Sequence, residues 1–164
     1  MMNFFSTTPT FSWEFLLRDS IWGIVVLFCV LIFHGGSINH VSMRFEKATR
    51  KNLSLKQYHR VFFHFYLAFV FFALIHLFEI LIWALFIIGF NLITDPLKAI
   101  LFAGSCYTTV GFEGNELPTG WKSLAFFISF TGLFSLAWTT SIMISMTNTY
   151  KEAWNKQYDP SADD

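Results

Sequence analysis

The stretch TDPLKAILFAGSCYTTVGFEGNELPTG, residues 94–120, decides the fold because it is polar and interrupted, yet lies between two long apolar segments. Asp95 followed by Pro96 predicts a helix start, since a capping side chain and a proline at the first helical position both favour one. The helix so begun, Pro96 to about Cys106, would be only about 16 Å long. Irregular backbone at membrane depth is tolerated only where protein buries it or water lines it. We therefore expect a re-entrant loop.

The apolar segments around this stretch predict three transmembrane helices, at residues 20–38, 61–93 and 121–146. Each is long enough for a bilayer core, which needs about 20 residues. The second would be about 50 Å long as a helix, which indicates one tilted helix rather than two spans and a turn. Only 13% of the residues are charged, against about a quarter in soluble domains. The fold class expected is therefore an all-α membrane protein.

The charged residues predict an orientation. Six of the 11 Lys and Arg residues fall within residues 44–60, between the first two spans. By the positive-inside rule this basic loop is cytoplasmic, and it could either bind anionic lipid headgroups or serve only to fix the topology. The amino terminus is then outside, the tail after residue 150 is cytoplasmic, and Trp22, Trp83 and Trp121 lie near the outer interface. The expected location is a plasma membrane or a bacterial inner membrane.

The run TTVGF, Thr108–Phe112, resembles the selectivity-filter signature of potassium channels, in which Thr-Val-Gly-Tyr/Phe-Gly-Asp follows a short pore helix. The resemblance extends over roughly residues 95–146. It implies that backbone carbonyls of Thr109, Val110, Gly111 and Phe112 bind potassium in place of water, with four loops around one axis. It therefore implies a homotetramer whose filter also includes Thr108 and Gly114, with potassium ions in the filter and no covalent cofactor.

The residues after Phe112 depart from the family pattern. The proline, Pro118, comes six residues after the aromatic residue, where the family has five. Either Glu113 is an insertion, with Gly114 as the second glycine and Asn115 in place of the aspartate, or Glu113 replaces that glycine. Glu113, Asn115 and Glu116 are the candidate filter-mouth residues. If Glu113 bulges behind the filter, the carbonyls of residues 109–111 could still bind potassium, whereas four Glu113 side chains around the mouth would concentrate cations there. A third alternative is an upper filter that collapses and conducts poorly.

The resemblance divides the chain into an amino-terminal segment (1–60) with an extra transmembrane helix and the basic loop, a pore domain (61–149) and a short tail (150–164). No arginine-repeat helix of the voltage-sensing kind occurs. In the expected inner helix, Gly132 is a candidate hinge or a site of close helix packing. Several hydroxyls there could wet a cavity below the filter or bond to backbone, namely Thr139, Thr140, Ser141, Ser145 and Thr147.

Ionisable residues within the apolar segments are candidate gating residues. His76 and Glu79 are three residues apart on one helix face, so they can pair structurally or sense protons. Four further histidines flank the basic loop and are expected near the cytoplasmic face, as a pH sensor, a metal site or interfacial residues: His34, His40, His59 and His64. Their spacings match no metal motif. Cys29 and Cys106 indicate neither a disulfide framework nor a metal cage.

The function expected is a tetrameric, potassium-selective cation channel. A non-selective channel passing sodium and potassium or divalent ions, and a non-conducting membrane interaction subunit, remain alternatives. A histidine- and glutamate-dependent proton or metal transporter is a further one. The sequence shows no arrangement of nucleophile, base and orienting group, which argues against an enzyme, and no nucleic-acid partner is expected.

Overall fold

The computed structural model describes residues 13–111, 116–118 and 120–158, and within them the chain is helical with short connections. The order is α1 (Trp13–Ser54), α2 (Tyr58–Gly89), α3 (Pro96–Tyr107) and α4 (Leu124–Tyr158). Helices α1, α2 and α4 are long and apolar enough to cross a membrane. The expected all-α fold with three such helices is therefore confirmed.

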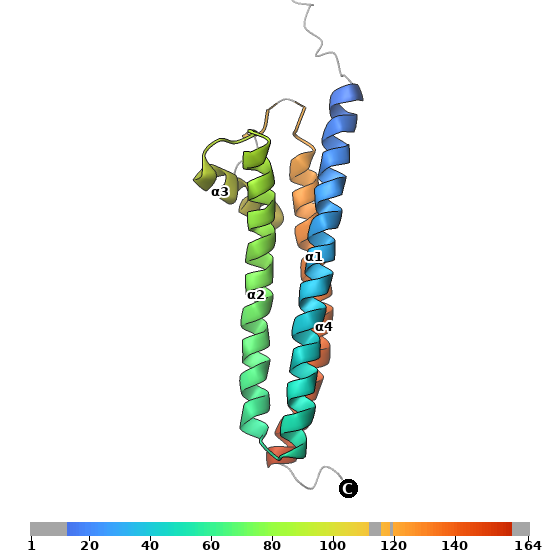
Figure 1. The fold of residues 1–164 in the computed structure, drawn as a ribbon, viewed down its shortest axis with the longest axis vertical. Helices are drawn as coiled ribbons and strands as arrows, with labels where there is room; N and C mark the ends of the chain where they lie inside the picture. The colour runs from blue at the N-terminus through green and yellow to red at the C-terminus, as the bar shows by residue number, and fades with distance from the viewer. Residues whose placement is uncertain (1–12, 112–115, 119, 159–164) are drawn as a thin grey trace, which may run out of the picture.

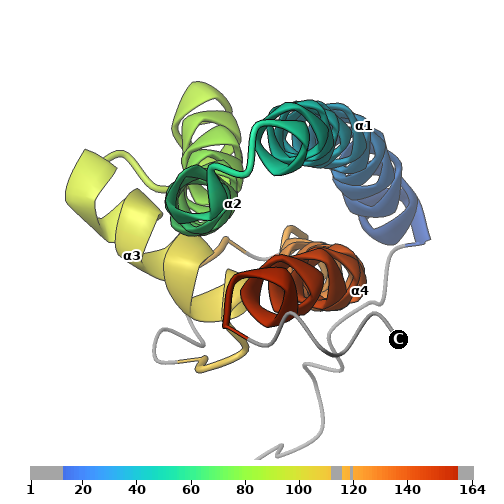
Figure 2. The same cartoon turned by 90° about the horizontal axis from the view of Figure 1, so that it is seen from below.

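The three long helices form a bundle, and α3 lies at the end where α1 begins and α2 ends (Figure 1). In the view along the bundle, α3 lies across α2 and α4 (Figure 2), and it packs against these two helices. At 12 residues, α3 is about 18 Å long and too short to cross a bilayer.

Helix α1 extends well beyond the segment expected, and it corrects the picture of a basic loop. The expected span of residues 20–38 lies within a helix of 42 residues that continues to Ser54. The basic stretch is rich in good helix formers, and Glu46 lies 3.8 Å from Arg50 one turn later. The positive charges of residues 44–60 predict on which side of the membrane this stretch lies, but they do not determine whether its backbone is a loop or a helix.

Helix α4 likewise continues beyond the expected span of 121–146 and includes most of the segment expected to be a tail. Its last turns are held to the start of α2 by aromatic contacts, with Phe62 lying 4.8 Å from Tyr150 and 5.5 Å from Trp154 between ring centroids. Lys156 also bonds Glu152 at 2.7 Å on the helix surface. The tail is therefore helical to Tyr158.

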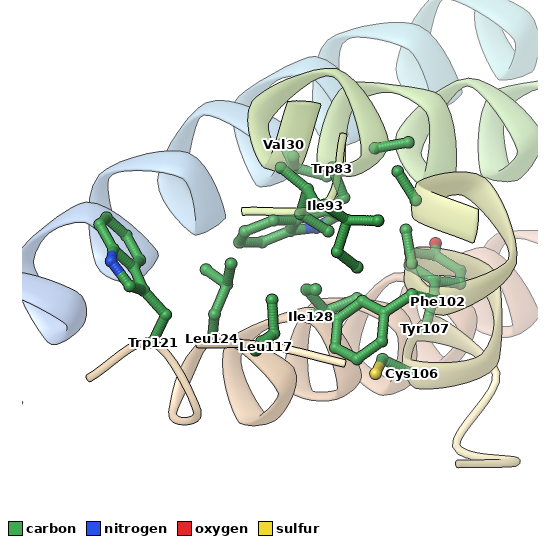
Figure 3. Close-up of a cluster of buried hydrophobic side chains, with 14 of the residues drawn as sticks. Val30, Trp83, Ile93, Phe102, Cys106, Tyr107, Leu117, Trp121, Leu124 and Ile128 are labelled. Carbon is green, nitrogen blue, oxygen red and sulfur yellow. The ribbon is translucent and has the colours of Figure 1, made fainter. Parts of the chain in front are cut away.

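Two apolar cores stabilise the bundle. The larger one joins all four helices and the segments next to α3 (Figure 3). The smaller one lies toward the other end and comprises Ile38, Phe45, Phe65, Ala68, Phe72, Ile75 and Met146. Trp83 belongs to the larger core and is fully buried, so its ring packs against the other helices, and its expected depth near the outer interface stays a prediction.

Candidate filter loop and the polar ring behind it

The start of α3 is fixed by the residues that predicted it. The Asp95 carboxylate accepts hydrogen bonds from the backbone N–H of Leu97 at 2.9 Å and of Lys98 at 3.3 Å. Pro96 is the first helical residue, where its missing N–H has no cost. The expected helix start is confirmed.

The end of α3 is a Schellman motif with an unusual residue in it. The Val110 N–H bonds the Ser105 carbonyl at 2.9 Å, and the Thr109 N–H bonds the Cys106 carbonyl at 2.9 Å, which is the paired pattern of that motif. Thr109 therefore has a left-handed backbone, with φ of +60°. This conformation suits glycine or asparagine and costs a β-branched residue about 1–2 kcal/mol.

Helices α1 and α2 end in the same motif, so a residue other than glycine at this position is not particular to α3; the β-branched side chain of Thr109 is. Lys56 and Asn91 hold the left-handed position there, with φ of +54° and +53°. Asparagine is a common choice, whereas threonine is not. Strain of this kind persists where the surrounding structure fixes the backbone, and it is concentrated at functional sites.

The backbone directly after α3 directs its donors toward the helix, and its acceptors find no partner in the part of the chain that the structure describes. The N–H groups of residues 108–111 bond to carbonyls of the last turn of α3. Within the described part of the chain, the carbonyl oxygens of residues 108–111 accept no hydrogen bond, and the four residues are exposed. Because carbonyl groups in an apolar environment need a partner, these oxygens are available to water or a cation.

Helix α4 supports the end of α3 directly. A Cβ added at Gly132 would overlap the Tyr107 carbonyl oxygen, so only glycine allows the two backbones to approach this closely. One turn earlier, the Ser129 hydroxyl donates to the Cys106 carbonyl at 2.8 Å. Gly132 thus has the close-packing role, and whether it is also a hinge stays a prediction.

Behind the end of α3, five polar side chains from four helices form a closed ring of hydrogen bonds. The Glu79 carboxylate contacts His34 Nδ1 at 2.6 Å and the Tyr107 hydroxyl at 2.5 Å. That hydroxyl contacts His76 Nδ1 at 2.8 Å. The Thr139 hydroxyl closes the ring, at 3.1 Å from His76 Nε2 and 3.4 Å from His34 Nε2.

The ring has five contacts, and each needs one proton. The two hydroxyls and the two neutral imidazoles carry four of these protons. The fifth lies either on Glu79 or on an imidazole, and in both cases the cluster has no net charge. With His34 charged and Glu79 ionised, or with both neutral, every contact has one donor and one acceptor. Removing or adding a proton breaks at least one contact. The ring therefore allows Glu79 and His34 to be fully buried without a net buried charge.

His76 and Glu79 face other helices, as their spacing suggested, but they are not each other's main partners. His76 Nδ1 lies 3.9 Å from the Glu79 carboxylate, farther than the Tyr107 hydroxyl that bridges them. His34, His76 and Glu79 also have ligand atoms within 4.8 Å of one another, and two imidazoles with a carboxylate are ligands that zinc takes. Such an ion would have to displace ring contacts.

His34 is the principal correction among the histidines. It was expected with the others near the basic end, but it is fully buried in the ring. His40 and His64 do lie together beside a groove between α1 and α2, and His59 is exposed. The sequence offered one signal, which depends on α1 being continuous. His34 then lies ten residues before Arg44 on α1, and His76 lies twelve residues after His64 on α2. The two histidines are therefore at similar distances from the basic end of the bundle.

The remaining predicted residues are placed as follows. Thr140 is exposed and its hydroxyl bonds the Leu136 carbonyl at 2.8 Å, and Glu116 is exposed. Phe112, Glu113, Gly114 and Asn115 lie outside the described residues, so both alignments of Glu113 remain predictions. Sequence reasoning missed the roles of Tyr107 and Thr139 as ring members, because each depends on contacts between helices.

Comparisons with protein-family models, with curated proteins and with solved structures show no significant match.

Proposed function

We propose that the chain is the subunit of a homotetrameric cation channel, selective for potassium, in which α3 is a re-entrant pore helix and residues 108–114 are the filter. The observation that carries the proposal is the loop after α3. The N–H groups of residues 108–111 are bonded back to the helix, the carbonyl groups of these four residues have no donor in the described part of the chain, and Thr109 has a strained backbone. A dehydrated cation is the partner that such carbonyls suit.

Three features of the surrounding structure support this reading. The carboxyl end of α3 carries the negative end of the helix dipole, which favours a cation beside it. Gly132 and Ser129 hold that end against α4. The Tyr107 hydroxyl, at the last residue of α3, bonds to the buried Glu79, so the loop starts from a fixed base. A rigid base is what a coordination site requires.

A non-selective cation channel remains the second candidate, and the feature that favours it is Glu113. Four glutamates at one mouth would raise the local cation concentration and weaken discrimination between monovalent ions. In this proposal the amino terminus is outside and the carboxyl terminus is cytoplasmic, as the basic residues 44–60 indicate.

The test is ion flux through purified protein in liposomes, with a glycine substitution at the loop. Gly111→Ala places a methyl group where no atom lies within 4 Å, so its only cost is the backbone φ of +70°. We expect this variant to assemble normally but to lose potassium flux. Gly36→Ala is the matched control, because it also adds a methyl group in open space, within a helix.

The outcomes separate the candidates. Potassium flux in wild type and Gly36→Ala but not in Gly111→Ala supports the channel. Equal sodium and potassium flux in wild type selects the non-selective form. If wild type carries no flux, or Gly111→Ala retains it in full, the filter proposal is overturned.

A further inference from the structure

A groove of about 560 Å³ lies between the basic halves of α1 and α2. The residues that line it all belong to these two helices, none to α3 or α4. Its walls are apolar, and three nitrogen-bearing side chains stand among them. The lining residues that matter here are Val41, Phe45, Leu67 and Phe71 for the walls, and His40, Arg44 and His64 for the polar part.

The groove lies on the side of the molecule that the proposed pore does not use. Helices α3 and α4 carry the loop and its support, whereas the groove opens between α1 and α2. Helix α1 is also outside the two-helix unit that the filter resemblance covers. This side is therefore open to lipid unless another chain covers it.

The length of α1 is consistent with a position of the polar part of the groove at headgroup depth. Trp22, near the other end of α1, has its ring 5.1 Å from that of Phe90 at the end of α2. Along α1, Arg44 is about 33 Å from Trp22, which is close to the thickness of a bilayer core. When Trp22 lies at one interface, Arg44 lies at the opposite one and the apolar walls lie beneath it.

The charge of Arg44 has no counterion among the residues that the structure describes. The side chain is exposed, and within the described residues no carboxylate lies within ion-pair distance of it. Glu46, the nearest acid along the helix, pairs instead with Arg50 at 3.8 Å. A guanidinium group at a membrane interface matches the geometry of a phosphate group, which accepts two of its hydrogen bonds.

We propose that this groove binds an anionic phospholipid, with the phosphate on Arg44 between His40 and His64 and one acyl chain along the apolar walls. Apolar walls next to a cation that can bind phosphate fit a phospholipid, which has both an acyl chain and a phosphate. The unbalanced positive charge of Arg44 favours an anionic headgroup over a neutral one. The proposal requires that the chain spans a membrane, but it does not depend on the channel function.

The test measures lipid binding to the purified full chain in detergent by native mass spectrometry, with phosphatidylglycerol and phosphatidylcholine as probes. We expect phosphatidylglycerol to bind more tightly, and Arg44→Gln to weaken it about tenfold through loss of a charge-assisted hydrogen bond. Lys47→Gln is the matched control, because it removes the same charge from an exposed position on α1 that does not line the groove. It should change binding less than about twofold.

A second pair of variants tests the acyl-chain part. Leu67 lines the groove and is 37% exposed, whereas Leu74 is 42% exposed on α2 and does not line it. Leu67→Trp should fill the groove and weaken phosphatidylglycerol binding, while Leu74→Trp should not. Soluble glycerol phosphate should fail to compete.

Three results would overturn the proposal. The first is an equal loss of binding in Arg44→Gln and Lys47→Gln, which would show that general surface charge attracts the lipid. The second is equal affinity for phosphatidylglycerol and phosphatidylcholine. The third is full competition by glycerol phosphate. Because none of these readouts involves ion flux, failure here and failure of the channel proposal are distinguishable.

Discussion

Glu79 is the residue on which the polar ring depends, because its two oxygens hold His34 and Tyr107 at the same time. Because every contact in the ring needs one donor and one acceptor, the stability of the protein depends on which atoms of residue 79 can donate or accept a hydrogen bond, and not on its charge alone. Glutamine can take part in the ring, since its amide donates to His34 Nδ1 while its oxygen accepts from Tyr107. Leucine of similar size can do neither.

We therefore expect Glu79→Gln to change the free energy of unfolding by about 1 kcal/mol or less, and Glu79→Leu to lower it by about 3–5 kcal/mol, as for a buried pair that loses one partner. Thermal unfolding of the two purified variants in one detergent checks this. Equal destabilisation by both variants would contradict the closed ring.

At the scale of elements, α3 could be predicted from the sequence because its start depends on adjacent residues. Asp95 and Pro96 act within one turn, and no other part of the chain is needed to recognise them. The lengths of α1 and α4 could not be predicted in the same way. Hydropathy marks where the membrane ends, whereas these helices continue as far as contacts such as Phe62 with Trp154 support them.

The cap of α3 gives a prediction at this scale. Asp95→Ala should lower stability by about 1 kcal/mol, because two N–H groups at the start of a 12-residue helix lose their acceptor. Asp95→Asn should restore most of it, since asparagine caps helices nearly as well. Hydrogen exchange of the α3 amides is the measurement. Similar exchange in both variants would show that charge near the helix start, rather than the cap, was responsible.

At the scale of the whole molecule, the polar ring lay beyond prediction because it combines residues 34, 76, 79, 107 and 139. Each residue alone is an ordinary polar residue in an apolar helix, and only the arrangement of four helices brings them within 3.4 Å of a neighbour. The filter loop was the opposite case, because its residues are contiguous. For the filter loop, what the sequence does not contain is the arrangement of several chains.

A mixing experiment tests that arrangement. If four loops must surround one axis, a single Gly111→Ala subunit should block the whole assembly, so coexpression with wild type in equal amounts should leave about one-sixteenth of the flux. Chains that conduct singly would leave about half. Coexpression with Gly36→Ala, whose added methyl group meets no atom within 4 Å, should leave the flux unchanged. Native mass spectrometry of the same samples should give four chains of 19.0 kDa per particle. Half-maximal flux from the first mixture would contradict the shared axis even if the particles were tetrameric, because it would show that each subunit carries its own pathway.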